Sequence, residues 1–374
     1  MFLLAMRNLF HDKLRLVVTL TGIVFAVVLI VIELGLFVGF TRTTSALIDH
    51  SHVDLWVTSS HVPYLELGVP MNERKLYQVE AVPGVAGVEK YIVRYSRWNR
   101  LDGGQDQIQV IGFDPDRSWG GPWNVVEGDV RDLKIPDGVM VDDVYKKKLG
   151  VTRIGEVFEI NGHRARVVGF THDIRSFTTS PCVFTSFRNA LDYVPIDRNQ
   201  TTYLLVQTDS GADIETVRQS IHDHVEGVDV LTTREFSHLT QRYWTFTTGA
   251  GIAILLGAIL GLMVGFVVVA QTIYATTMEH LKEFGTLKAM GAPNGYVRKV
   301  ILLQALIAAV MGYAIGMALS GVAVRFGQPA GAPVVMNGWM ALGTLIITLT
   351  MCAGASLISI NKVTRLDPAT VFKG

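Results

Sequence analysis

Four long stretches of this 374-residue sequence carry almost no charge. Between Arg15 and Arg42 the only ionisable side chain is Glu33. Three further intervals contain no Asp, Glu, Lys or Arg at all, namely 243–278, 300–324 and 326–361. A bilayer core of about 30 Å requires about 20 helical residues at about 1.5 Å each, and all four stretches are long enough. The sequence therefore predicts four membrane-spanning helices.

Two other interpretations of these stretches are weaker. A large soluble protein can bury apolar helices, but core helices rarely run so long without a charge, and the mean hydropathy of +0.34 favours a membrane protein. The first stretch could also be a cleaved signal peptide. Its apolar run is longer than the 7 to 15 residues of a signal sequence, and no small-residue cleavage site follows it. We expect a permanent anchor.

The formal net charge of zero hides an asymmetry that predicts the orientation. Residues 42–245 contain 22 Lys and Arg against 28 Asp and Glu, whereas the rest of the chain has 11 against 5. Short flanks rich in Lys and Arg stay in the cytoplasm. These flanks contain Arg7, Lys13, Arg15, Lys282, Lys288, Arg298, Lys299, Lys362, Arg365 and Lys373. We therefore expect a multi-pass protein of the bacterial inner membrane with both termini in the cytoplasm and the 42–245 block outside.

The expected domain order follows from the spans and their orientation. We expect a cytoplasmic amphipathic helix at 1–15, spans at 16–41, 246–274, 297–324 and 339–361, an extracytoplasmic domain at 42–245, a cytoplasmic coupling helix and loop at 275–296, a short external loop at 325–338 and a cytoplasmic tail at 362–374. The fold class is thus an α-helical membrane protein with four transmembrane helices and an α/β domain inserted between helices 1 and 2.

The outer block shows signals of both strands and helices. Asn161-Gly162 between two apolar runs predicts a β-hairpin, and Asp102-Gly103-Gly104 precedes a second alternating run. Helical patterns occur at 72–79 and at 214–225, where Asp213 is a candidate N-cap. Asp142-Asp143 and Lys146 to Lys148 read as an exposed turn and a solvated helix end. We expect one compact domain, and since Cys182 and Cys352 lie in different parts of the chain, no disulfide holds it together.

The segment between the second and third spans has the pattern of a docking helix. Apolar side chains recur every three residues from Leu281 to Met290, Gly291 ends the helix and Pro293 opens the next one. The alternative is an interfacial helix that packs only on its own spans. The candidate docking residues are Glu283, Phe284, Thr286, Leu287, Lys288 and Met290, with Gly291 as the hinge.

Glu33 is the one carboxylate inside a span. It lies 18 residues after Arg15, which places it about 27 Å along the helix, near the outer edge of the hydrocarbon. Helical spacing puts it on one face with Gly22 and Ala26. It either lines a lateral portal for an amphiphile or extends its carboxylate to water. The candidate portal residues are Glu33, Phe37, Phe40, Tyr243 and Trp244, since aromatic side chains gather at the outer interface.

Small residues at four-residue spacing mark two other spans. Gly257, Gly261 and Gly265 form one such face, and Gly312, Gly316 and Ser320 form another. Because small residues let helices approach closely in lipid, these faces predict tight helix packing.

The sequence shows no pattern of a catalytic or metal site. It contains no GxxxxGK[S/T] loop, so any ATP and Mg²⁺ belong to a partner subunit and this chain binds no cofactor of its own. No spacing marks a catalytic triad. His50, His52 and His61 read as a solvated loop, because His-x-His supplies only two ligands.

Several segments resemble one family of membrane proteins. EFGTLKAMGA at 283–292 is similar to the cytoplasmic loop of the FtsX/MacB-like permeases, the type VII ABC transporters. AMRNLFHDKLR at the start, RLDPATVF at 365–372, and VMVDDVYKKKLGV followed by IGEVFEINGHRARVVGF resemble the N-terminal helix, the tail and the external core domain of that family. Within the family, EHLKEFGTLKAMG, DLWVTS and GFDPD look closest to the DevC-like and haem-export permeases. Many MacB-type members carry Glu-Arg where this chain has Glu279-His280, so one salt contact to the ATPase is absent or moved.

The resemblance implies a function and its partners. Two permease copies would pair with two ATPase subunits, whose closure moves the outer domains by mechanotransmission and exports an amphiphile such as a glycolipid or haem. A periplasmic adaptor and an outer-membrane duct are further implied partners, along with membrane lipids but no nucleic acid. The main alternative is an FtsX-like regulator that activates a cell-wall hydrolase; an enzyme is the weakest option.

Overall fold

Among the described residues, four helices are long and apolar enough to cross a membrane. The computed structural model describes Met6, Phe10 and residues 13–117, 119–178, 180–279, 283, 285, 286, 288, 290–327 and 334–364, apart from the side chains at 15, 358, 359 and 361–364. The helices are α2 (Lys13–Asp49), α8 (Ala250–Glu279), α10 (Asn294–Gly327) and α11 (Gly338–Thr364). The predicted helix at 1–15 falls largely outside the described residues.

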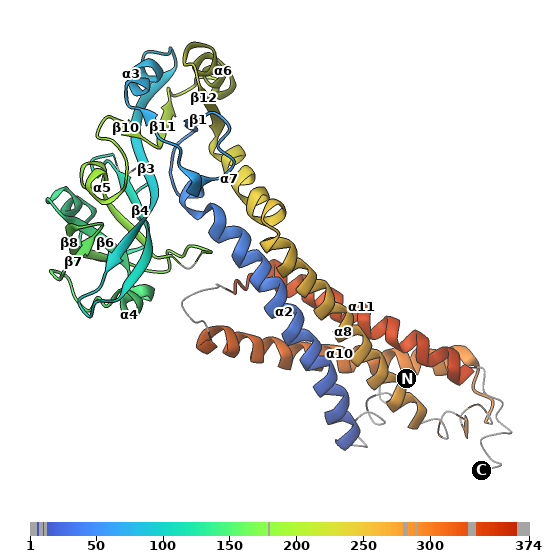
Figure 1. Cartoon of the computed structure of the whole chain (residues 1–374). Helices are drawn as coiled ribbons and strands as arrows, with labels where there is room; N and C mark the ends of the chain where they lie inside the picture. The colour runs from blue at the N-terminus through green and yellow to red at the C-terminus, as the bar shows by residue number, and fades with distance from the viewer. Residues whose placement is uncertain are drawn as a thin grey trace. The chain divides into compact units, whose positions relative to one another are not determined.

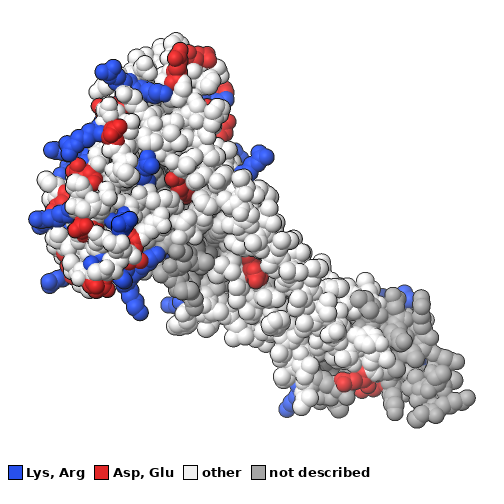
Figure 2. All heavy atoms as spheres, in the orientation of Figure 1, with Lys and Arg blue, Asp and Glu red and all other residues white. Residues whose placement is uncertain are grey.

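The chain divides into two compact units (Figure 1). Among the described residues, those of the membrane unit fall within 1–39, 252–328 and 333–374, and those of the outer domain fall within 40–251. Charged side chains gather over the outer domain and are rare along the helices, as Figure 2 shows. This division confirms the predicted fold class of four membrane helices with an α/β domain inserted between the first and second.

The outer domain contains twelve strands among its described residues. They are β1 (Leu55–Ser59), β2 (Met71–Asn72), β3 (Val85–Asn99), β4 (Gln105–Phe113), β5 (Val125–Glu127), β6 (Gly138–Asp142), β7 (Val157–Ile160), β8 (His163–Thr171), β9 (Cys182–Ser186), β10 (Gln200–Thr201), β11 (Tyr203–Thr208) and β12 (Val228–Thr232). The short helices are η1 (Leu65–Leu67), α3 (Arg74–Glu80), η2 (Val130–Lys134), η3 (Asp143–Tyr145), α4 (Lys146–Leu149), α5 (Phe187–Tyr193), α6 (Ile214–His224), α7 (Thr233–Arg242) and the π-helical η4 (Tyr243–Thr247).

The long strand β3 belongs to two lobes. Its first half pairs antiparallel with β11, which continues to β1 and β12. Its second half pairs with β4 and β7, and the order β3-β4-β9-β6-β8-β7 returns to β3. Six strands therefore form a closed ring, and all six contribute to one apolar cluster that includes Trp98, Val110 and Val183. A closed ring leaves no free edge for a second chain to pair with.

The first lobe buries both faces of its four strands. Val57, Leu204 and Val230 face α3 and α6 on one side. On the other side Trp56 packs in a cluster that contains Leu47 and Ile48 from the end of α2, as well as Phe236 of α7. Alternate side chains of a strand point to opposite faces, so the same strands serve both clusters. The last residues of α2 are thereby part of the core of the outer domain.

Most local predictions for the outer domain are confirmed. Asn161-Gly162 connects β7 to β8 and Asp102-Gly103-Gly104 connects β3 to β4, both as antiparallel hairpins. The predicted helices correspond to α3 and α6, and Asp213 caps α6 by accepting from the backbone N–H of Thr216 at 3.1 Å. Cys182 and Cys352 are both buried free thiols.

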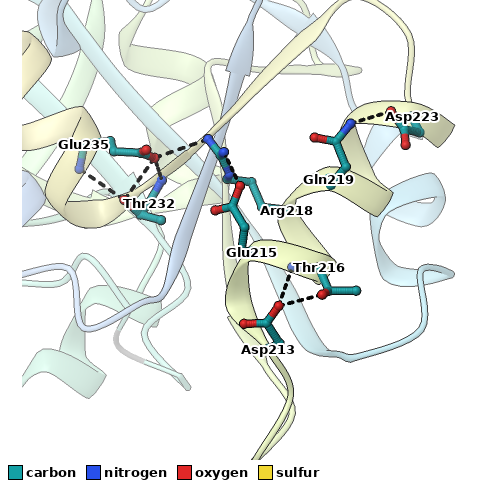
Figure 3. A network of polar contacts seen from close by, with 8 residues as sticks. All are labelled: Asp213, Glu215, Thr216, Arg218, Gln219, Asp223, Thr232 and Glu235. Atoms are coloured by element: carbon teal, nitrogen blue, oxygen red, sulfur yellow. Dashed lines mark hydrogen bonds and ion pairs between the residues drawn. The ribbon is translucent and has the colours of Figure 1, made fainter.

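Polar contacts connect α6 to α7 at one end of the domain (Figure 3). The Arg218 guanidinium contacts Glu215 on its own helix, and it lies 3.5 Å from Glu235 on α7. Glu235 in turn closes a capping box with Thr232, whose backbone N–H donates to it at 2.9 Å. These contacts therefore hold the first turn of α7, the helix that leads to η4, against α6.

One local prediction is wrong. Asp142 is fully buried rather than in an exposed turn, and its carboxylate accepts from the Val144 N–H at 3.1 Å, the Thr171 hydroxyl at 2.9 Å and the Ile174 N–H at 2.7 Å. Burial raises the pKa of Asp142. Lys146, expected at a solvated helix end, extends over the ring of Phe170, with its Nζ 3.6 Å from the ring centroid. The sequence could not distinguish a charge that caps a buried turn from one in water.

Candidate functional site

The first candidate region is the seam between α2 and α8, which run antiparallel. The Thr19 and Thr276 hydroxyls lie 3.1 Å apart. Further along, a Cβ added to Gly265 would lie 3.0 Å from the Cβ of Ala26. A contact this short leaves no space for a larger side chain, so the glycine permits the close approach of the two helices.

Glu33 lies at the outer end of this seam. A Cβ at Gly257 would lie 3.1 Å from Glu33 Oε2, and one at Gly261 would lie 3.5 Å from Glu33 Cγ. The Glu33 side chain is half-buried. The two glycines thus form the surface on which the carboxyl group rests.

The glycines of α10 face α2 as well. A Cβ at Gly312 would lie 2.5 Å from Ile23 Cγ2, and one at Gly316 would lie 2.7 Å from Val27 Cγ1. Ile23 and Val27 are buried in the apolar core of the membrane unit. α2 therefore contacts α8 with one face and α10 with another.

The predicted coupling segment is described only in part, because Phe284 and Leu287 lie outside the described residues. Met290 is 72% exposed, and its N–H donates to the Thr286 carbonyl at 3.0 Å. Gly291 has φ +94°, the left-handed conformation typical of a residue just after a helix. The exposed methionine lies beside an open hollow of about 320 Å³, whose other lining residues are Gly291, Ala292, Pro293 and Tyr296.

Three of the five predicted portal residues share one aromatic cluster of the outer domain. The rings of Phe40 and Phe177 lie 5.5 Å apart, and Phe177 lies 4.2 Å from Trp244. Tyr243 stacks on Tyr64 at 4.1 Å. The other two predicted residues, Glu33 and Phe37, belong to the membrane unit. Phe177 and Tyr64 were not predicted, because nothing in the sequence links residues so far apart.

A carboxyl group that the sequence analysis missed lies in this cluster. Trp244 Nε1 donates to Glu66 Oε2 at 3.1 Å. Burial raises the pKa of Glu66 to about 7, although the Trp244 hydrogen bond opposes the shift by favouring the ionised form. The signal was present in the sequence, because Glu66 is the only charged residue between Val62 and Pro70.

The histidines form no metal site among the described residues, in which no group of three or more His, Cys, Asp or Glu side chains could hold an ion. His50 instead stacks on Trp123 with ring centroids 4.1 Å apart. His52 and His61 are exposed and occupy turns with positive φ. This arrangement fits the polar loop expected from the sequence.

These features define a class: a four-span membrane protein whose outer α/β domain is inserted between the first two spans. Residues 16–224 match the model of the MacB-like periplasmic core domain, and residues 255–368 match the FtsX-like permease C-terminal model. The chain belongs to the FtsX/MacB-like family of ABC transporter permeases. The narrower resemblance to DevC-like and haem-export permeases stays a prediction.

Individual relatives are distant. An uncharacterized ABC transporter permease, Rv0072 of Mycobacterium tuberculosis, is 26% identical over 388 residues and matches along 100% of both chains. The macrolide export ATP-binding/permease protein MacB of Rhodopirellula baltica is 21% identical over 59% of this chain and 38% of its own length. The periplasmic region of MacB from Actinobacillus actinomycetemcomitans covers 50% of this chain and 92% of that structure, with 10% identity and a TM-score of 0.38.

Proposed function

We propose that this chain is the permease subunit of a bacterial type VII ABC exporter, in which ATP hydrolysis by a separate subunit moves the outer domain and drives export of an amphiphilic substrate. Two ATPase copies, each with ATP and Mg²⁺, would pair with two copies of this chain in the inner membrane, with both termini in the cytoplasm. An adaptor and an outer-membrane duct would complete the export path.

One observation carries the proposal: α2 is a single helix of 37 residues. At about 1.5 Å per residue it is about 55 Å long, whereas a hydrocarbon core is about 30 Å thick. Its first part belongs to the membrane unit, and its last ten residues belong to the outer domain, where Leu47 and Ile48 are buried. A continuous helix transmits displacement along its axis because its backbone hydrogen bonds resist compression and bending.

The return connection is anchored at the same place. Gln241 of α7 donates from Nε2 to the Ser45 hydroxyl of α2 at 2.8 Å. Thr233, the first residue of α7, donates to the Val53 carbonyl at 2.6 Å. α7, which leads from the outer domain toward α8, is therefore hydrogen-bonded to the end of α2. Movement of either connection would reach the same part of the domain.

In this proposal Glu283, Thr286, Lys288 and Met290 contact the ATPase together with Phe284 and Leu287, and Gly291 is the hinge. Glu33 and Phe37 in the span, with Phe40, Tyr243 and Trp244 outside it, line the lateral portal for the substrate. Gly257, Gly261, Gly265, Gly312 and Gly316 keep the helices close enough to move as one body.

The continuity of α2 can be tested by interrupting it at Arg42, whose side chain is exposed. Proline inside a helix removes a hydrogen bond and costs about 3 kcal/mol, so Arg42→Pro should bend α2. Arg42→Ala is the matched control, since it removes the same side chain and keeps the helix. The complex with its co-purifying ATPase is reconstituted in vesicles made from the lipids of the source membrane.

We expect Arg42→Pro to retain ATPase binding and basal ATP hydrolysis but to lose ATP-dependent release of lipid-soluble cargo from the vesicles, with Arg42→Ala like the wild type. Equal release by both variants would contradict mechanotransmission. If neither the wild type nor Arg42→Ala releases cargo, and a cell-wall hydrolase co-purifies and is activated by ATP, the FtsX-like regulator is the correct function. Leu287→Asp tests docking separately, because it should reduce stimulated ATP hydrolysis and leave membrane insertion intact.

A further inference from the structure

Glu66 occupies an unusual position between the sheet and the connection to α8. It lies on η1, and its carboxyl group accepts a hydrogen bond from Trp244, which is part of the five-residue π-helical segment η4. Five residues lie between Trp244 and Ala250, where α8 begins. π-Helical turns are rare and occur frequently at functional positions. Glu66 is therefore bonded to a segment with an uncommon backbone conformation.

Aromatic rings enclose one side of this hydrogen bond. The Tyr64 ring lies 5.3 Å from that of Trp244 and 4.1 Å from that of Tyr243, and Phe177 packs against Trp244 at 4.2 Å. These rings offer no cation to balance an ionised carboxylate. A charge in such surroundings is costly unless water reaches it.

A small polar cavity lies on the other side of Glu66. It has a volume of about 10 Å³, close to the space of one water molecule, and Thr43, Gln109 and Cys182 are among its lining residues. Gln109 is 1% exposed, and its buried Nε2 has no hydrogen-bond partner among the described residues. An unsatisfied buried donor beside a cavity of this size indicates a site for an ordered water. That water would be the first of a path to the carboxyl group.

Burial moves the pKa values of several other groups around Glu66 further from neutral pH. Burial raises the pKa of Tyr95 to about 12 and raises those of Tyr64, Tyr203 and Cys182 as well. Arg175, also in the cavity wall, carries a constant charge and is paired with Asp173 at 2.5 Å. The remaining facing groups are the phenol of Tyr243 and the indole of Trp244.

We propose that Glu66, which is half-buried, is a proton-operated latch. When protonated, it stays hydrogen-bonded to Trp244 and holds η4 to the outer domain; when ionised, it takes up water from the side of the Gln109 cavity and releases η4. The latch is built into the fold and does not rest on the proposed function. It would regulate how firmly the connection to α8 is held, whatever the chain moves.

The direction of the pH dependence follows from linkage. In the closed state burial raises the pKa of Glu66 to about 7, whereas a hydrated glutamate titrates at about 4.3. The closed state therefore binds the proton more tightly than the open state, so acid favours closure. As the pH rises through about 7 the closed state loses this advantage, and the full change in the equilibrium is on the order of a hundredfold.

The test uses the full chain in lipid nanodiscs and measures hydrogen exchange of peptides that cover 243–249 from about pH 5 to about pH 9, corrected for the intrinsic rate. In the wild type we expect protection to fall on the order of a hundredfold as the pH rises. Glu66→Gln, which is neutral at every pH, should keep η4 protected throughout. Glu127→Gln removes an exposed carboxylate of the same domain and should behave like the wild type.

A second measurement does not depend on whether Glu66→Gln folds. Infrared difference spectra of the wild type should show the C=O stretch of one protonated carboxyl disappearing near pH 7. Trp244→Phe removes the hydrogen bond that favours the ionised form, so its midpoint should move to higher pH. The proposal is wrong if Glu66→Gln keeps the pH response of the wild type, if wild-type protection does not change with pH, or if Trp244→Phe leaves the midpoint in place.

Discussion

The membrane unit and the outer domain bury polar groups in different ways. In the membrane helices, many hydroxyls bond to carbonyls of the preceding turn, as Thr272 does to Val268 at 2.7 Å and Ser320 does to Gly316 at 2.8 Å, although Thr19 and Thr276 meet between two helices. In the outer domain, polar side chains connect distant segments: the Thr202 hydroxyl donates to the Tyr91 carbonyl at 2.9 Å. Lipid offers no hydrogen bonds, so a polar group inside it is satisfied most simply by its own helix.

The two regions also gain their packing energy from different contacts. The outer domain fills its core with large side chains such as Trp56, Trp98 and Phe184. The membrane unit has glycines where its helices touch, such as Gly265 and Gly312, and the lack of a side chain lets the backbones approach closely. Removal of apolar surface from water stabilises the first region, whereas only van der Waals contact and hydrogen bonding stabilise the second. Truncation of a large side chain should therefore be costly in the outer domain, and enlargement of a glycine should be costly in the membrane unit.

The largest expected effect is that of truncation in the outer core. Trp56 is fully buried, and its ring lies 5.3 to 5.6 Å from those of Tyr91, Tyr203 and Phe236. Trp56→Ala should lower the free energy of unfolding by about 3–5 kcal/mol, measured by urea unfolding with near-UV circular dichroism. Trp56→Phe should cost much less, because the buried Nε1 has no hydrogen-bond partner among the described residues. Equal losses for both variants would mean that ring packing is not what holds this core.

Enlargement of a glycine in the membrane unit comes next. Gly312→Leu forces a side chain into Ile23 and should cost about 1–3 kcal/mol. Gly321→Leu on the same helix is the matched control, because no atom lies within 4 Å of the position where its Cβ would be. Thermal unfolding in detergent, followed by the far-UV helix signal, would compare them. A similar loss of thermal stability for both variants would show that close glycine contacts do not stabilise the membrane unit, and the proposed difference from the outer domain would be wrong.

A smaller effect is expected at the start of α7. Thr232→Ala removes the hydroxyl that accepts from the Glu235 N–H at 3.2 Å and should cost about 1 kcal/mol. Thr232→Ser keeps the hydroxyl and serves as the control. Urea unfolding of the full chain measures both. If Thr232→Ala matches the wild type, the capping box does not define the start of α7.

The smallest effect concerns His172. Its hydrogen bond to Asp143, with Nδ1 2.9 Å from Oδ1, raises the pKa of the imidazole. The contact therefore contributes to stability at low pH and loses that contribution as the pH rises through the raised pKa. Asp143→Asn should return the pKa toward its ordinary value, which NMR titration of the ring protons would detect. An unchanged titration would show that the exposed contact does not persist in solution.

Patterns within single elements predicted most of the fold. Charge-free runs predicted the four helices, and Asn161-Gly162 and Asp213 predicted a hairpin and a helix cap, because each depends on neighbours in the chain. The closed ring was not predictable, since β3 meets both β4 and β7 through pairings that leave no local signal. The burial of Asp142 was likewise not predicted, because it depends on a loop some 30 residues away in the chain.

The amino-acid sequence alone determined which segments enter the membrane and the family to which the chain belongs, because insertion depends on the apolar length of each segment and recognition on local motifs. Only the tertiary structure brought Glu66, Trp244 and Gln109 together around one aromatic cluster and one small cavity. The reason is physical: desolvation of a carboxyl group depends on everything packed around it, and those residues come from strands, loops and helices far apart in the chain.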